Sequence, residues 1–414
     1  MSEAIEKATA AKAAAALLAQ SSAAERTDAI LGAAQSVSDG RDRILAANGA
    51  DMRRARANGM PGPMLDRLVL DDARIDGIVS AMREVAGQPD PIGEVVGGRT
   101  LASGIRLTQV RVPLGVIGMI YEARPNVTAD AAGICIRTGN ACILRGGSMA
   151  QRSCVAIAHA LADAVEACGF SREAVSIIET TDRAATGALM GLRGIVDVLI
   201  PRGGAGLIRS VVENSTVPVI ETGSGNCHIY IDEFANIDMA AEIVFNAKTS
   251  RPSVCNACES VLIHKAAAEE AIVAVAGRLK EKNVEIFGDE VVCSVLDFAK
   301  PATEEDWGKE YLDYKISIKT VDNIDEAIAH IAKYSTGHSE SIVTDDYLNA
   351  QKFLNEVDSA AVYVNASTRF TDGGEFGFGA EIGISTQKLH ARGPLGLNNL
   401  TSEKYIVYGS GQIR

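Results

Sequence analysis

Two cysteines three residues apart, Cys255 and Cys258, stand in the segment "RPSVCNACES", and this spacing is compatible with several kinds of chemistry. A structural zinc site needs four ligands, but here one pair has only His264 nearby. A redox dithiol of the thioredoxin type opens a helix in a small domain, whereas this pair precedes an apolar run. Two interpretations fit the residues better: two ordinary buried cysteines, or a nucleophilic thiolate at Cys255 that neighbouring turn-forming residues present.

The composition narrows the classes of partner. The chain has 414 residues, enough for two or three domains, with a formal net charge of −13 and a pI near 5.1. Such an acidic protein is not expected to bind nucleic acid or an anionic membrane surface. No apolar run approaches the roughly 18 residues of a membrane span, and the charged start does not resemble a signal peptide. The 8 cysteines are scattered, which favours a reducing cytoplasm.

The periodicity of apolar residues predicts the elements that position these cysteines. The chain begins with helices, one of which has a capping-box pattern at Ser22 and Glu25 and ends at Gly40. A continuous apolar run at 115–121 then predicts a buried strand, after which strands and helices alternate. The expected strands lie at 141–146, 174–180, 196–204 and 217–223, with helices at 149–168, 184–193 and 205–214.

A second alternating set runs from "CHIYIDE" to about residue 367, so we predict two α/β domains with doubly wound parallel sheets. Neither GxGxxG after a strand nor GxxxxGK[ST] occurs in the sequence, so neither of these nucleotide-binding motifs is present. Pattern and composition alone therefore predict a multi-domain α/β protein and no specific function.

Three longer segments carry more information: "VPLGVIGMIYEARPNVTADAA", "RPSVCNA" and "FGFGAEIGISTQKLHARGPLGL". In this order they resemble the γ-glutamyl phosphate reductases of the aldehyde dehydrogenase superfamily, and the resemblance covers essentially the whole chain. It implies an aldehyde-dehydrogenase-like fold with an NADP(H)-binding domain at 1–228, joined by part of 366–392, and a catalytic cysteine domain at 229–365. It also implies an oligomerisation flap at 98–114 and 393–414, and hence a homodimer or homotetramer.

The resemblance implies that NADPH reduces L-glutamyl 5-phosphate to L-glutamate 5-semialdehyde and phosphate, the second step of proline biosynthesis. Cys255 matches the nucleophile, whose thiolate would displace phosphate and form a thioester that accepts a hydride. Arg251 is a candidate for stabilising that thiolate by adjacency alone. The acyl phosphate would come from glutamate 5-kinase, a separate protein.

Five further residues are expected to serve the oxyanion or the cofactor. Asn126 in "EARPNVT" would donate its amide to the oxyanion, although a helix N-cap is the alternative. Arg145 would read the 2′-phosphate of NADPH, and Gly203 with Gly204 would open a helix that receives a phosphate. Glu310 would hold the nicotinamide ribose; the alternative is a solvated strand-edge acid.

Glu221 stands in "ETGSGNCH", where hydrolytic aldehyde dehydrogenases place the glutamate that activates water. Activated water beside the thioester would waste the substrate, so we expect Glu221 at the cofactor rather than as that base. Arg124, His338 and Ser339 are expected to bind the anionic substrate, with a loop histidine as the alternative for His338.

The resemblance does not account for Cys258, and we hypothesise a reversible disulfide with Cys255 from their spacing. Two rival functions stay open: a hydrolytic aldehyde dehydrogenase on the same fold, and a non-catalytic redox or metal-binding protein that uses the cysteine pair. His390 and Arg392 in "LHARGP" are expected to help fold or assemble the end of the chain. No metal is expected.

Overall fold

The computed structural model describes residues 2–414 and divides into two compact units. Unit 1 comprises residues 2–222, 377–383 and 394–414, and unit 2 comprises Gly223–Phe376 and Ile384–Gly393. The main boundary therefore falls between Thr222 and Gly223, a few residues before the predicted one. Both units contain a parallel sheet, which confirms the predicted α/β class.

Unit 1 is built on a four-stranded sheet with the order β5-β4-β3-β6, in which all neighbours are parallel. Its strands are β3 (Val116–Tyr121), β4 (Ala141–Gly146), β5 (Val175–Ile177) and β6 (Val198–Arg202). Every residue of β3 and β4 is buried, because helices cover both faces of the sheet. This is why these strands read as continuous apolar runs in the sequence.

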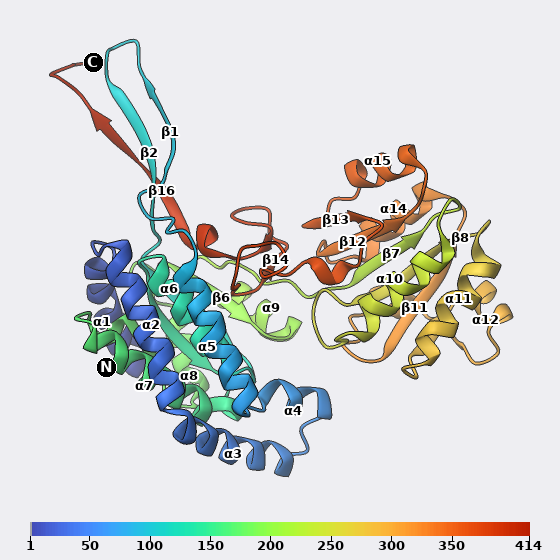
Figure 1. Cartoon of the computed structure of the whole chain (residues 1–414), viewed down its shortest axis with the longest axis horizontal. Helices are drawn as coiled ribbons and strands as arrows, with labels where there is room; N and C mark the ends of the chain where they lie inside the picture. The colour runs from blue at the N-terminus through green and yellow to red at the C-terminus, as the bar shows by residue number, and fades with distance from the viewer. Residues whose placement is uncertain (1) are drawn as a thin grey trace. The chain divides into compact units, whose positions relative to one another are not determined.

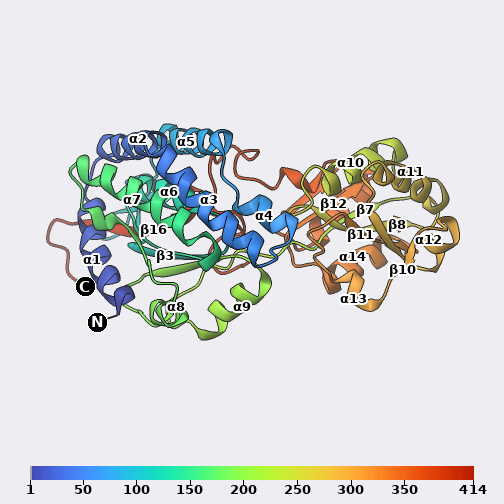
Figure 2. The same cartoon turned by 90° about the horizontal axis from the view of Figure 1, so that it is seen from below.

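The helices of unit 1 lie on both sides of this sheet, some directly on it and others in an outer layer that packs on those helices (Figure 2). They are α1 (Glu3–Leu18), α2 (Ala23–Asp39), α3 (Arg41–Ala57), α4 (Gly62–Leu68), α5 (Asp72–Gly87), α6 (Asn126–Arg137), α7 (Gln151–Ala167), α8 (Arg183–Met190) and α9 (Ala205–Asn214). The alanine face of α1 packs with α8 and α9 against one side of the sheet, while α6 and α7 cover the other. The predicted capping box at Ser22 and Glu25 is confirmed, and Gly40 is the C-cap of α2.

A three-stranded antiparallel sheet projects from the body of unit 1 (Figure 1). It joins β1 (Val95–Thr100), β2 (Arg106–Pro113) and β16 (Thr401–Tyr408), with β2 in the centre. The outer strands β1 and β16 each have one edge that no other strand of residues 2–414 pairs with. Tyr405, Val407 and Tyr408 on β16 are more than half exposed, at 61%, 55% and 54%.

Unit 2 contains a seven-stranded sheet with the order β10-β9-β11-β8-β7-β12-β13. Its strands are β7 (Cys227–Ile231), β8 (Cys258–His264), β9 (Glu285–Gly288), β10 (Lys300–Pro301), β11 (Lys315–Val321), β12 (Ser339–Val343) and β13 (Ala361–Val364). All adjacent strands are parallel.

The faces of this sheet are covered by two groups of helices, which are visible in Figure 1. One apolar cluster joins the sheet to α10 (Ile237–Thr249), α11 (Ala268–Lys280) and α12 (Glu290–Val295). Another joins its opposite face to α14 (Ile324–Tyr334) and α15 (Tyr347–Glu356). The short helix α13 (Glu304–Trp307) precedes β11.

The strand predicted at 217–223 is wrong. Only one isolated bridge, between Leu199 and Val219, joins this segment to β6. Pro218 has no N–H to donate, and its carbonyl and the amide of Ile220 make the two bonds to Leu199 that define the bridge. The segment therefore continues as a loop into unit 2.

No helix among residues 2–414 combines the length and apolar character that crossing a bilayer requires.

A buried ion pair ties α10 to the sheet of unit 2. Lys248 Nζ donates to Glu259 Oε2 at 2.6 Å, and both side chains are completely buried. Burial raises the pKa of Glu259 to about 7, although Lys248 lowers it. The second carboxylate oxygen of Glu259 accepts a hydrogen bond from the backbone N–H of Leu312 at 3.2 Å. The pair thus fixes a loop as well as a helix.

We predict that Lys248→Met destabilises unit 2 by about 3–5 kcal/mol, because Glu259 is left as an unpaired buried acid. Urea denaturation followed by circular dichroism measures the change. Lys248→Met combined with Glu259→Leu should recover most of the loss. Lys265→Met is the matched control, since its pair with Asp322 is exposed and contributes less than about 1 kcal/mol. Equal effects of the two lysine variants would show that the buried pair matters no more to stability than an exposed one.

Candidate active site

Cys255 lies in a turn between α10 and β8, where its side chain is partly exposed. Strands β7, β8, β11 and β12 are parallel neighbours, so the residues that precede them meet at one edge of the sheet. These residues are Gly225 and Asn226, Cys255 to Ala257, Glu310 to Leu312, and His338. The nucleophile candidate therefore stands at the amino edge of the unit 2 sheet.

Gly225 fixes the backbone of Cys255 by close approach. A Cβ at Gly225 would lie 1.4 Å from the Cys255 carbonyl oxygen and 2.4 Å from its carbonyl carbon, so no side chain fits there. The Cys227 thiol donates to the same oxygen at 3.2 Å. The backbone of Gly225 is itself held, because its N–H donates to Glu310 Oε1 at 2.7 Å.

We call residues 250–257, which lie between α10 and β8, the cysteine loop. Glu310, the predicted ribose ligand, thus lies beside the cysteine loop and is not a free strand-edge acid. Its carboxylate holds the loop that contacts Cys255, and Leu312, two residues on, is bonded to the buried Glu259. Whether Glu310 also contacts a ribose stays a prediction. Its position gives it one structural function that the sequence did not reveal.

Asn256 connects the cysteine loop to a segment that no motif indicated. Its side-chain amide donates to the carbonyl oxygens of Arg369 and Thr371, at 3.3 and 2.9 Å. The backbone carbonyl oxygen of Asn256 accepts a hydrogen bond from Thr368 Oγ1 at 2.7 Å. Arg369 completes the connection, since Nη1 donates to Asn256 Oδ1 and Nε donates to Ser250 Oγ. Arg369 is the main functional candidate that no sequence motif revealed.

His338 and Ser339 lie beneath the loop, where both are completely buried. His338 Nδ1 is 2.8 Å from Ser339 Oγ and 3.7 Å from Cys227 Sγ. Ser339 Oγ in turn is 2.6 Å from Thr371 Oγ1. This burial gives both residues a supporting position behind Cys255, and their contact with substrate stays a prediction.

The hypothesised disulfide between Cys255 and Cys258 gains no support from the structure. Cys258 opens β8, is completely buried and packs in the core with Val261 and Ile229. Its Sγ donates to the carbonyl oxygen of Ser260 at 3.3 Å, and burial raises the pKa of this thiol far above its usual range. A thiol in this position reacts slowly with oxidants because little of it is ionised.

In unit 1 the predicted cofactor residues lie at the carboxyl edge of the sheet. The glycine turn at Gly203 and Gly204 follows β6 and opens α9. Glu122, which follows β3, accepts a hydrogen bond from the N–H of Gly204 at 2.9 Å. A Cβ at Gly203 would lie 2.7 Å from the same Glu122 oxygen, so a side chain there would displace the Glu122 carboxylate. The first amide predicted to receive a phosphate therefore already binds a carboxylate.

Arg145 is buried at the end of β4, with 6% of its surface exposed. Its guanidinium donates to the carbonyl oxygens of Gly146 and Asp182. Burial lowers the pKa of Arg145. Whether Arg145 also contacts a 2′-phosphate stays a prediction.

Asn126 is the first residue of α6 and is exposed. The helix has no side-chain cap, so the alternative interpretation of Asn126 as an N-cap is wrong. Instead its Nδ2 donates to Asp130 Oδ2 at 2.9 Å. Burial raises the pKa of Asp130 to about 6, while Asn126 and Arg202 lower it. An ionised carboxylate only accepts hydrogen bonds, so the Asn126 amide must turn its nitrogen rather than its oxygen toward Asp130.

Arg124 and Glu221, the two remaining predicted residues, are half-buried in unit 1. Arg124 lies in the turn between β3 and α6, where its N–H donates to the carbonyl oxygen of Glu122. Glu221 lies in the loop that replaces the expected strand. Their predicted roles stay predictions.

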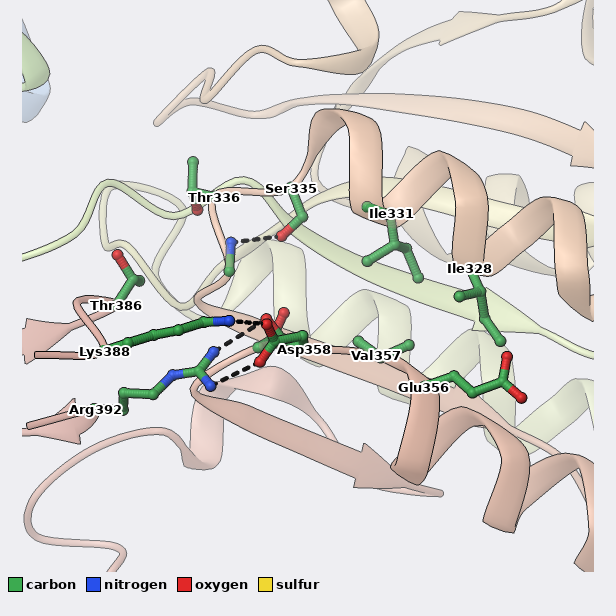
Figure 3. A pocket seen from close by; sticks show the side chains of 13 residues that line it. Ile328, Ile331, Ser335, Thr336, Glu356, Val357, Asp358, Thr386, Lys388 and Arg392 are labelled. Atoms are coloured by element: carbon green, nitrogen blue, oxygen red, sulfur yellow. Dashed lines mark hydrogen bonds and ion pairs between the residues drawn. The ribbon is translucent and has the colours of Figure 1, made fainter.

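A pocket of about 380 Å³ opens in unit 2 between α14, the end of α15 and the segment 386–392. Figure 3 shows Lys388 and Arg392 converging on Asp358. Both carboxylate oxygens of Asp358 accept from these cations, and its carbonyl oxygen accepts from Arg392 at 3.0 Å. Because the cations are paired, we interpret the cluster as an anchor for the C-terminal segment, the role expected for Arg392.

Within the part of the chain that the structure describes, no three His, Cys, Asp or Glu side chains are grouped as metal ligands.

A family profile, curated sequences and a solved structure all relate the chain to the same family. The sequence profile of the aldehyde dehydrogenase family matches residues 1–291. The γ-glutamyl phosphate reductase of Lachnospira eligens is 56% identical over 390 residues, which cover 94% of each chain. That of Clostridium botulinum strain Eklund 17B is 54% identical over the full length of both chains. The crystal structure of γ-glutamyl phosphate reductase from Thermotoga maritima is 48% identical, covers all of both chains and gives a TM-score of 0.96.

We predict that Gly225→Ala lowers any turnover that depends on the Cys255 thiol by about 100-fold, because the cysteine backbone must move by about 1 Å or more. Steady-state kinetics and a thermal melt distinguish lost geometry from lost folding. Gly277→Ala on α11 is the matched control, since its Cβ meets nothing within 4 Å. Near-normal turnover in Gly225→Ala would show that the close approach does not set the position of the thiol.

Proposed function

The chain belongs to the γ-glutamyl phosphate reductases of the aldehyde dehydrogenase family, and we propose that it reduces L-glutamyl 5-phosphate to L-glutamate 5-semialdehyde with NADPH. The observation that carries this proposal is the constrained loop around Cys255. Gly225 allows its backbone approach, Glu310 holds Gly225, and Asn256 is tied to the segment at 368–371. An ordinary buried cysteine needs no such arrangement.

In the proposed reaction, the Cys255 thiolate attacks the acyl carbon, and phosphate leaves with the electrons of the broken carbon–oxygen bond. The product is a thioester, which is reduced and then releases the aldehyde and regenerates the thiol. The oxyanion formed at each addition needs a donor, and the amide of Asn126 keeps this predicted role. Its bond to Asp130 supports the role, because it leaves the second N–H of the amide for another acceptor.

A nicotinamide cofactor fits the carboxyl edge of the unit 1 sheet, the usual position in open α/β folds. The supporting observation is the cradle at Gly203, which a Cβ would fill. The N-terminus of α9 favours an anion at the amides of Ala205 and Gly206, which follow the one occupied by Glu122. When bound, the cofactor supplies the hydride. Preference for NADPH over NADH is part of the proposal.

We also propose that the enzyme works in the cytoplasm, in the second step of proline biosynthesis, on acyl phosphate made by a glutamate 5-kinase. All 8 cysteines are free in the structure, in agreement with a reducing compartment.

The three-stranded sheet β1-β2-β16 supports assembly into a homodimer or homotetramer. Its two outer strands present unpaired edges, and an exposed edge beside exposed apolar side chains is usually covered in soluble proteins. A second copy of the chain that pairs with such an edge would cover it.

We predict that the double variant Tyr405→Glu/Val407→Glu lowers the molar mass in solution to that of a monomer. Light scattering coupled to size exclusion measures it, and circular dichroism checks that the fold is retained. Leu17→Glu serves as the control, because Leu17 is 63% exposed on α1 and is not part of this sheet. An unchanged assembly in the double variant would rule out β16 as the interface.

The reaction itself is tested in both directions. Glutamate 5-semialdehyde with NADP⁺ should yield NADPH only when phosphate is present, and Cys255→Ser should abolish this. In the forward direction, glutamate, ATP and glutamate 5-kinase supply the acyl phosphate, and NADPH is consumed. NADPH formation without phosphate would favour a hydrolytic aldehyde dehydrogenase. No turnover from folded wild-type protein would refute the proposed reaction.

A further inference from the structure

Arg369 lies across the cysteine loop. Its Nε donates to Ser250 Oγ at 3.2 Å, and its Nη1 donates to Asn256 Oδ1. Ser250 directly precedes Arg251, and Asn256 directly follows Cys255. The guanidinium of Arg369 is therefore held against the two ends of a loop that carries a second arginine and the thiol.

These two arginines repel each other in unit 2. Burial lowers the pKa of Arg369 and the charge of Arg251 lowers it further, whereas Asp372 and the nearby thiol of Cys255 oppose this. Arg251 is exposed, and within residues 2–414 its side chain makes no hydrogen bond or ion pair. A chain of net charge −13 thus holds two neighbouring cations beside a nucleophile, which is unfavourable unless an anion binds them.

The chemistry of the proposed substrate indicates which anion these two arginines bind. L-Glutamyl 5-phosphate carries a carboxylate at one end and a phosphate at the other, and only the phosphate is attached to the carbon that Cys255 attacks. A cation beside the thiol therefore meets the phosphate first. Arginine suits this task because its planar guanidinium binds two phosphate oxygens at once.

We propose that Arg251 and Arg369 form the phosphate subsite, which holds the phosphoryl group of the substrate beside Cys255. This subsite rests on the proposed reaction. It extends that reaction to Arg369, which no motif indicated, and to Arg251, which was expected only to stabilise the thiolate. In the forward direction the carbon–sulfur bond forms, the carbon–oxygen bond to phosphate breaks, and the arginines stabilise the departing dianion. In reverse they bind inorganic phosphate, whose oxygen attacks the thioester carbon as the thiolate leaves.

The deciding variant is Arg251→Gln, because the Arg251 side chain does not hold the loop. In the reverse reaction, the KM for phosphate should rise about tenfold or more, while the KM for NADP⁺ changes little. Arg369→Lys keeps the charge but not the two bonds to the loop, and should show a smaller rise than Arg369→Gln. Arg278→Gln is the matched control, since Arg278 is paired with Glu242 and Glu281 on the surface of the same unit.

A binding measurement that needs no turnover accompanies the kinetics. Inorganic phosphate should slow the alkylation of Cys255 by iodoacetamide, followed by mass spectrometry, in the wild type and in Arg278→Gln. The protection should be lost in Arg251→Gln and Arg369→Gln. A wild-type KM for phosphate together with unchanged protection in Arg251→Gln would overturn the proposal. If the wild type shows no reductase activity, the proposed reaction fails, but the protection experiment still decides whether phosphate binds these arginines.

Discussion

The geometry of the candidate active site depends on the buried ion pair between Lys248 and Glu259. Two opposite charges at 2.6 Å, both shielded from water, must stay together because separating them leaves an unsolvated ion. Their hydrogen-bond connections lead outward from the core. Glu259 holds the amide of Leu312, and Glu310 in the same segment holds Gly225, which touches the backbone of Cys255. These contacts act on the backbone of Cys255 and so position its thiol.

The candidate site residues of the two units lie at opposite edges of their respective sheets. In unit 1 the glycine turn, Glu122 and Asn126 follow their strands, at the carboxyl edge where helix N-termini attract anions. In unit 2 the cysteine loop, Gly225 and Glu310 precede their strands, at the amino edge. Helix N-termini are few at that edge, so positive charge there comes from side chains. Arg251 and Arg369 supply it, and this explains why an acidic protein places two arginines together.

Much of the fold was predictable because it depends on local pattern. Continuous apolar runs revealed β3 and β4, and Ser22 with Glu25 marked the start of α2. The strand expected at 217–223 failed because Pro218 and tertiary packing reduced it to a single bridge, which periodicity does not register. The architecture of two parallel sheets followed from the alternation of strands and helices, and it was correct.

The candidate site was predictable only where a motif is contiguous. Cys255 and Asn126 stand in such motifs, but burial of Arg145 and His338 depends on neighbours from other elements. Arg369 was missed because it is 113 residues from Asn256 in sequence and meets it only where the turn at 368–370 packs on α10 and β12. Glu122 escaped notice for the same reason, since its partner Gly204 is 82 residues away.

These separations have a consequence for how the protein matures. The hydrogen bonds that fix Cys255 and Asn256 join residues 28 to 115 positions apart, and the bond that holds Gly225 spans 85. Contacts of such high order form late, after the strands between them have paired. The nascent chain therefore carries an unpositioned thiol until the unit 2 sheet is nearly complete. Recovery of catalytic competence after refolding should consequently lag behind the recovery of helix and strand content.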